Sequence, residues 1–219
     1  YEMHLLHNEY TGGLKLGAST TIAQYVLPPL LASFIGKFPQ VNLSLLNGNS
    51  REIEAALQEH RIDLGFVEGV FRLPNIKYTT FLEDELVAVV RTGSRLTVGE
   101  EITPDELFHL PLVLRERGSG TLDVFERALQ QHNIKLSSLQ VLMYLGSTES
   151  IKLFWEHTDC LGIVSIRSIT RELYSGQLRV VEIKGMPMLR DFSFAQPQGQ
   201  ESGLAQVFMQ FAMHNNHKL

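Results

Sequence analysis

The sequence predicts an α/β protein whose sheets are dominated by parallel strands and covered by helices on both faces. Short apolar stretches of strand length alternate along the chain with segments in which apolar residues recur every three or four positions. This alternation is typical of strand–helix–strand units, in which a helix returns the chain to the same end of a sheet. The chain shows neither an internal repeat nor an obvious flexible linker. If there are two lobes, strands would therefore have to join them.

The first third of the chain contains a lead-in, residues 1–12, followed by alternating strands and helices. Pro28 and Pro29 stand at the start of one helix, where a missing N–H costs little, and Pro39 ends it. Ser50 follows the turn signal Asn-Gly-Asn and is the expected N-cap of the next helix. We expect strands at 14–18, 41–45 and 63–67, and helices at 30–38 and 50–59.

The same alternation continues through the middle of the chain. The residues TPDE at 103–106 form a capping box with proline at the first helical position, which predicts one short helix. Apolar residues on one face predict two longer helices, and continuous apolar runs predict buried strands. We expect these strands at 86–90, 112–115, 141–145 and 160–166, and the two helices at 122–129 and 151–157.

Composition argues against several classes of protein. Acidic residues outnumber basic ones, 24 against 19, for a net charge of −5, whereas contacts from Lys and Arg to phosphates dominate nucleic-acid affinity. The chain is therefore a poor candidate for gripping DNA by itself. No run approaches the roughly 20 apolar residues that a membrane-spanning helix needs. The single cysteine, Cys160, excludes an intrachain disulfide and indicates a reducing, cytoplasmic environment.

Three turns share one physical feature: an apolar strand ends in a small, hydroxyl-rich turn that begins a helix. They are Ser19-Thr20-Thr21, Gly118-Ser119-Gly120-Thr121 and Gly146-Ser147-Thr148. The start of a helix presents unpaired N–H groups, so each turn could donate hydrogen bonds to an anion or a carbonyl group. For any one turn alone, ordinary N-capping is the better explanation, but three such turns together weaken it, because capping does not require Gly-Ser-Gly-Thr. In open α/β sheets, such turns lie where ligands bind.

Motifs for catalysis and for cofactor or metal binding are missing. The residues GASTT at 17–21 lack the final glycine of a nucleophile elbow, and Gly36-Lys37 lacks the rest of a phosphate-binding loop. The histidines are scattered, and Cys160 has no neighbouring base, so we interpret it as a buried structural thiol. Glu68 and Glu149 are the acids nearest the three turns, and each could instead be a solvated or helix-start charge. We expect no enzyme activity, no cofactor and no metal.

A series of short motifs resembles the effector-binding domain of LysR-type transcriptional regulators. No single motif is diagnostic, but their order and spacing together are specific, and they extend over nearly the whole chain. The motifs are GLKLGASTT at 13–21, YVLPPLL at 25–31, FIGKFP at 34–39, GNS at 48–50, AAL at 55–57, RIDLGFVEG at 61–69, EDELV at 83–87, LRERGSGT at 114–121, GSTESIK at 146–152 and LGIV at 161–164.

The resemblance implies a two-lobed fold like that of the periplasmic binding proteins, with lobes joined by crossover strands near Glu83 and Glu182. After the lead-in, the first lobe would comprise residues 13–83 and 183–219, and the second lobe residues 84–182. By position, the resemblance places nine residues at an effector cleft between the lobes: Ser19, Thr20, Thr21 and Glu68 from the first, and Gly118, Ser119, Gly120, Thr121 and Thr148 from the second.

The implied function is ligand sensing by a regulator that lacks its N-terminal DNA-binding domain in this chain. An effector in the cleft would alter DNA binding and transcription by the full-length protein, and DNA and RNA polymerase would be contacted only through that protein. We expect a homodimer or homotetramer in the cytoplasm, with no membrane partner. The helix starts favour a small anion or carboxylate, whereas Glu68 and Glu149 would suit an amine. The alternative is a stand-alone solute-binding protein of a transporter, which shares the fold.

Overall fold

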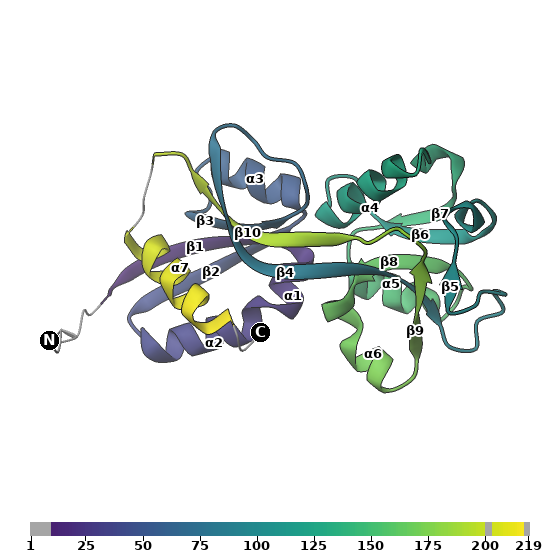
Figure 1. Ribbon diagram of the computed structural model, residues 1–219. Coiled ribbons are helices and arrows are strands. Elements are labelled where there is room, and N and C mark those ends of the chain that lie inside the picture. Colours follow the sequence, from purple (N-terminus) through teal and green to yellow (C-terminus); the bar gives the residue numbers. More distant parts are fainter. Residues whose placement is uncertain (1–9, 200–202, 217–219) are drawn as a thin grey trace, which may run out of the picture.

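The computed structural model describes residues 10–199 and 203–216, which form two lobes side by side (Figure 1). Two long antiparallel strands, β4 (Ile76–Arg91) and β10 (Leu189–Pro197), run from one lobe into the other. Along β4 the pairing partner changes: residues up to Glu85 pair with β10, and residues from Leu86 pair with β8 of the second lobe. The predicted crossover strands are therefore present, and the expected two-lobed α/β fold is confirmed.

The first lobe is a parallel sheet extended by the two crossover strands. Its strands β1 (Gly12–Ser19), β2 (Val41–Gly48) and β3 (Leu64–Glu68) are ordered β2-β1-β3-β10-β4. Helices α1 (Thr20–Tyr25), α2 (Leu27–Lys37) and α7 (Gly203–Asn215) share one core with the sheet, whereas α3 (Ser50–Gln58) packs in a separate core. Parallel strands place their carboxyl ends at one edge, so β1 and β3 both end at the second lobe.

The second lobe repeats this arrangement. It contains β5 (Glu101–Ile102), β6 (Pro111–Arg115), β7 (Gln140–Leu145), β8 (Leu161–Ser165) and β9 (Leu178–Ile183), together with helices α4 (Gly120–Gln131), α5 (Thr148–Trp155) and α6 (Thr170–Tyr174). Three short 3₁₀ helices complete it: η1 (Pro104–His109), η2 (Leu136–Ser138) and η3 (Ile166–Ile169). Neighbours Leu112 and Val113 of β6 pack with α4 and α5 respectively, so these helices cover opposite faces of the sheet.

The structure corrects three details of the predicted elements. The helix expected from Leu30 begins at Leu27, with both prolines in its first turn, and the separate α1 precedes it. Asn49, and not Ser50, caps α3: its side chain accepts a hydrogen bond from the Glu52 N–H at 3.0 Å. The helix at the TPDE capping box is a 3₁₀ helix. The lead-in prediction falls largely on residues 1–9, outside the described residues.

Gly162 of β8 lies against the ring of Trp155, and this contact predicts a stability effect. A Cβ at position 162 would overlap the buried ring edge of Trp155. We expect Gly162→Ala to lower the free energy of unfolding by about 1–3 kcal/mol, because the packed core has to shift. Gly146→Ala is the matched control, since a Cβ there meets nothing within 4 Å. Urea unfolding of both variants is the measurement, and equal midpoints would contradict the expected clash.

Candidate functional site

The two lobes meet at Glu68, the last residue of β3. The Glu68 side chain is 1% exposed, and its Oε1 accepts hydrogen bonds from two hydroxyl groups on opposite lobes. Thr21, in the first turn of α1, donates at 3.3 Å, and Thr121, in the first turn of α4, donates at 3.4 Å. The carboxylate therefore joins two of the hydroxyl-rich turns across the junction of the lobes, which we call the seam.

The backbone on either side of the seam is also in close contact. A Cβ on Gly120 would lie 2.5 Å from the Glu68 carbonyl carbon, so only glycine fits at this place. Gly118, with φ +93°, accepts a hydrogen bond from the Arg51 N–H at 3.3 Å. On the first-lobe side, the Ser50 hydroxyl fixes the end of β3 by donating to the Glu68 carbonyl at 2.8 Å.

A buried arginine from the crossover strand β10 completes the junction. The Arg190 guanidinium lies 2.7 Å from Asp84 Oδ2 and 3.2 Å from Glu68 Oε2, and it donates to the Thr121 hydroxyl at 3.0 Å. Asp84 stands on β4 and also accepts from Ser165 Oγ at 2.7 Å. All three charged side chains are at most 1% exposed. Arg190 therefore compensates two buried carboxylates, which are costly to bury unpaired.

A second polar group spans the seam on the face of the second-lobe sheet covered by α5. The Tyr25 hydroxyl of α1 donates to Glu149 of α5, and Lys152 lies between Glu149, at 3.0 Å, and Glu172, at 2.9 Å. Burial and the neighbouring Glu149 carboxylate raise the pKa of the Tyr25 hydroxyl, which therefore stays a hydrogen-bond donor.

Arg115 lies beside this group, at the carboxyl end of β6. Its Nε and Nη2 donate to the Glu116 carboxylate at 2.8 and 3.1 Å, and Nη2 is also 3.3 Å from the Gly146 carbonyl oxygen. The side chain is 1% exposed, yet Nη1 has no hydrogen-bond partner among the described residues. Across the seam, the buried Ser19 Oγ likewise has no partner in the described part of the chain. Each lobe thus has a buried, unsatisfied polar group at the carboxyl end of a strand: Ser19 at the end of β1 and Arg115 at the end of β6.

The structure brings some predicted site residues together and separates others. Thr21, Glu68, Gly120 and Thr121 touch one another at the seam. The Thr20 hydroxyl turns back to the Gly48 carbonyl at 3.1 Å, within the first lobe.

The remaining hydroxyls of the predicted site belong to helix starts. Ser119 caps α4 by accepting from the Leu122 N–H at 3.2 Å, as ordinary N-capping predicts. Thr148 is buried in the first turn of α5. Arg190 and Asp84 were not among the predicted site residues, because nothing in their local sequence marks a charge on a crossover strand as buried.

The described residues offer little support for other chemistry. No group of three metal-ligating side chains occurs among them. Cys160 is buried, and burial raises its thiol pKa to about 11, which leaves the reactive thiolate scarce at neutral pH. Within the described ranges, no helix is long and apolar enough to cross a bilayer.

The chain is similar in sequence to bacterial transcriptional regulators. The chain is 35% identical over 182 residues to the uncharacterized HTH-type transcriptional regulator YeiE of Escherichia coli K12, a match covering 83% of this chain and 61% of the relative. The HTH-type transcriptional regulator CysL of Bacillus subtilis is 26% identical over 193 residues, covering 88% and 64%. The chain thus spans about three fifths of the length of these relatives.

A solved structure shows the same architecture. The regulatory domain of CcmR from Synechocystis, in complex with 2-PG, superposes with a TM-score of 0.83 at 27% identity, covering 93% of this chain and 97% of that one. The sequence pattern of the family described as LysR substrate binding domain matches residues 7–216. This match extends over both lobes and both crossover strands. The chain belongs to the family of LysR substrate-binding domains.

Proposed function

We propose that this domain is the effector-sensing part of a LysR-type transcription regulator and binds a small anion between its lobes. The observation that carries the proposal is a pair of buried groups without a hydrogen-bond partner among the described residues: Ser19 Oγ, at the end of β1 in the first lobe, and Arg115 Nη1, at the end of β6 in the second. Buried polar atoms are normally satisfied, and ligands of open α/β sheets bind at the carboxyl ends of the strands, so a ligand that contacts both groups is the best explanation. Both can donate hydrogen bonds.

The charges at the seam favour an anion over an amine. Glu68 and Glu149, the two carboxylates that would attract a cation, already have partners in Arg190 and Lys152 respectively. An oxyanion or carboxylate would accept from Arg115 Nη1, whose planar guanidinium suits such groups. The binding of 2-PG by the Synechocystis relative supports a small-molecule effector in this family.

Effector binding acts through the relative position of the lobes. A ligand shifts an equilibrium only by its differential affinity for two states, and a site made of both lobes has different affinities when they are closed and when they are apart. The sequence predicts that the units that move are residues 13–83 with 183–219, and residues 84–182. Because Ile183, Met186 and Met188 pack in the core of the second lobe, we take the second boundary at Leu189, where β10 begins. The change of pairing partner on β4 after Glu85 supports a hinge near these boundaries.

The domain acts as a homodimer or homotetramer in the cytoplasm, and not as an enzyme. The edge strands β2 and β7, at opposite ends of the sheet, expose Leu45, Leu46, Leu142, Met143 and Tyr144. Apolar side chains on edge strands are typical of surfaces that another subunit covers. Pairing each lobe with the opposite lobe of a partner covers both edges.

DNA and RNA polymerase are contacted only by the full-length protein. Membership of this family favours the regulator over the stand-alone solute-binding protein.

Ser19→Ala tests the site with little risk to the fold, because the hydroxyl has no hydrogen-bond partner among the described residues. Isothermal titration with sulfate, phosphate, small carboxylates and amines should find an anion that binds the unmodified domain. We expect Ser19→Ala and Arg115→Met each to weaken binding of that anion roughly ten- to a hundredfold, as for hydrogen bonds to a charged group. Ser137→Ala, which removes an exposed hydroxyl on η2, is the control. Anion affinity that is the same in all variants would place the site elsewhere.

A further inference from the structure

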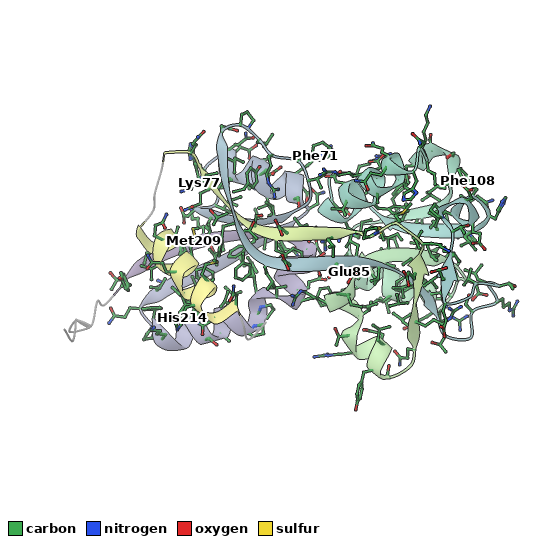
Figure 2. The ribbon with its side chains drawn as sticks, viewed as in Figure 1. Phe71, Lys77, Glu85, Phe108, Met209 and His214 are labelled. Carbon is green, nitrogen blue, oxygen red and sulfur yellow. The ribbon has the colours of Figure 1, made fainter. Side chains whose placement is uncertain are left out.

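A cavity of about 320 Å³ opens at the seam between α3 and α4, and we call it the α3–α4 cavity. Its walls come from both lobes: Glu54 and Gln58 on α3, Phe71 and Leu73 in the loop after β3, and Asp123 on α4. Figure 2 shows Phe71 above the gap between these two helices. Arg115 reaches the turn before α5, on the other face of the second-lobe sheet, so the cavity is distinct from the proposed anion site.

Carboxylates dominate the lining of the α3–α4 cavity. Glu54, Glu68 and Asp123 contribute negative charge, and Arg51 is the one cationic residue among those that line it. Glu68 is paired with Arg190, and Glu54 accepts a hydrogen bond from the Tyr78 hydroxyl at 2.6 Å. Burial raises the pKa of both Glu54 and Asp123, and the nearby arginines offset this only in part.

Asp123 is held less closely than the other two carboxylates of the lining. Its side chain is 9% exposed, and its carboxylate accepts no hydrogen bond from any described residue. The nearest cationic nitrogen is Arg51 Nη2, at 4.0 Å. A buried ionised carboxylate is costly unless it is paired, and a pair at this distance neutralises it only weakly.

Arg51 indicates which chemical group the cavity attracts. Its guanidinium carbon lies 5.9 Å from the centre of the Phe71 ring, which is 60% exposed, and the same side chain approaches Asp123. A cation between an aromatic face and a carboxylate is a recurrent mode of amine recognition. The Arg51 side chain is itself 63% exposed, so it occupies this position loosely and can leave it.

We propose that the α3–α4 cavity binds a small organic cation, a primary amine or guanidinium on a short carbon chain, with its charge against Asp123 and Phe71. The volume lies at the lower end of the roughly 300–1,000 Å³ of small-molecule sites. Because Asp123 belongs to the second lobe and Phe71 to the first, the bound cation holds the lobes together from the α3–α4 side. The domain thus has a second ligand site, of opposite charge preference to the anion site.

The proposal is tested by titrating the domain with two cations, n-butylamine and agmatine. Uncharged n-butanol, similar in size to n-butylamine, is the control. We expect both cations to bind and n-butanol not to bind. Asp123→Asn should weaken cation binding at least about tenfold, because it removes the charge that the ligand neutralises. Arg51→Met should tighten it, because the competing internal cation is gone. Asp105→Asn, a charge deletion on the exposed surface of η1, should leave it unchanged.

Three results would overturn the proposal: no binding of either cation to the unmodified domain, equal binding of n-butanol, or undiminished affinity in Asp123→Asn. If Asp123→Asn does not fold, Arg51→Met is the deciding variant, because the Arg51 side chain is mostly exposed and its loss leaves the core intact. Unchanged or weaker cation affinity in Arg51→Met would also overturn the proposal. Sulfate titration of the same variants separates this site from the anion site, because affinity for the anion depends on Ser19 and Arg115 and not on Asp123.

Discussion

Replacing Arg190 by methionine is expected to lower the free energy of unfolding by about 3–5 kcal/mol, the usual cost of removing one partner of a buried ion pair. The substitution leaves Asp84 and Glu68, both at most 1% exposed, without the guanidinium that lies 2.7 and 3.2 Å from them. Their carboxylates cannot reach water without opening the seam. Equilibrium urea unfolding, monitored by the fluorescence of the buried Trp155, measures the change.

Two further variants separate charge compensation from mere loss of a large side chain. Arg95→Met removes an exposed arginine and should change stability by no more than about 0.5 kcal/mol. Adding Glu68→Gln to Arg190→Met should recover part of the lost stability, because Glu68 then has no cation nearby among the described residues, whereas Asp84 keeps Arg167 Nε at 3.6 Å. A cost for Arg190→Met as small as that for Arg95→Met would show that the buried carboxylates do not depend on Arg190.

Gly120→Ala is expected to force the lobes apart. The new Cβ would lie 2.5 Å from the Glu68 carbonyl carbon, a backbone atom that cannot rotate away. The end of β3 and the start of α4 must therefore separate, which breaks the bonds from Thr21 and Thr121 to the Glu68 carboxylate. We expect a loss of about 1–3 kcal/mol in stability, as for other overpacked sites, and weaker anion binding because the site walls no longer face each other.

Small-angle scattering measures the separation as an increase in the radius of gyration. Gly36→Ala on α2 is the matched control, because a Cβ there meets nothing within 4 Å. Alanine in a helix is more stable than glycine by roughly 0.5–1 kcal/mol, so this control should be neutral or stabilising. An unchanged radius of gyration and unchanged anion affinity in Gly120→Ala would mean that the contact at Glu68 does not set the lobe arrangement.

Much of the fold follows from patterns that are local in the sequence. Alternating apolar strands and helices predict the parallel parts of both lobes, and the TPDE capping box predicts η1. The crossover strand β4 is harder to predict. Only its last stretch, 86–90, is continuously apolar, because its earlier residues are buried, half-buried and exposed in no regular order.

The site is only partly predictable, because contacts between segments that are distant in the sequence decide what each side chain does. Hydroxyl-rich turns at helix starts are visible in the sequence, but whether a hydroxyl caps its own helix, as Ser119 does, or reaches the other lobe, as Thr121 does, depends on tertiary contacts. Arg190 and Asp84 pair across two strands that are distant in the chain, so neither residue carries a local signal of burial. Long-range compensation of charge is a property of the folded structure alone.

The most direct test of the account is the distance between the lobes with and without an anionic effector. Spin labels on Ala32→Cys, exposed on α2, and Ser137→Cys, exposed in η2, report this distance by pulsed electron resonance, with the buried Cys160 replaced by alanine. Adding the anion that binds best in the titration panel should shift and narrow the distance distribution, and the Arg115→Met variant should not respond at the same concentration. Binding of that anion with no change in the distribution would contradict the claim that the effector acts by setting the arrangement of the two lobes.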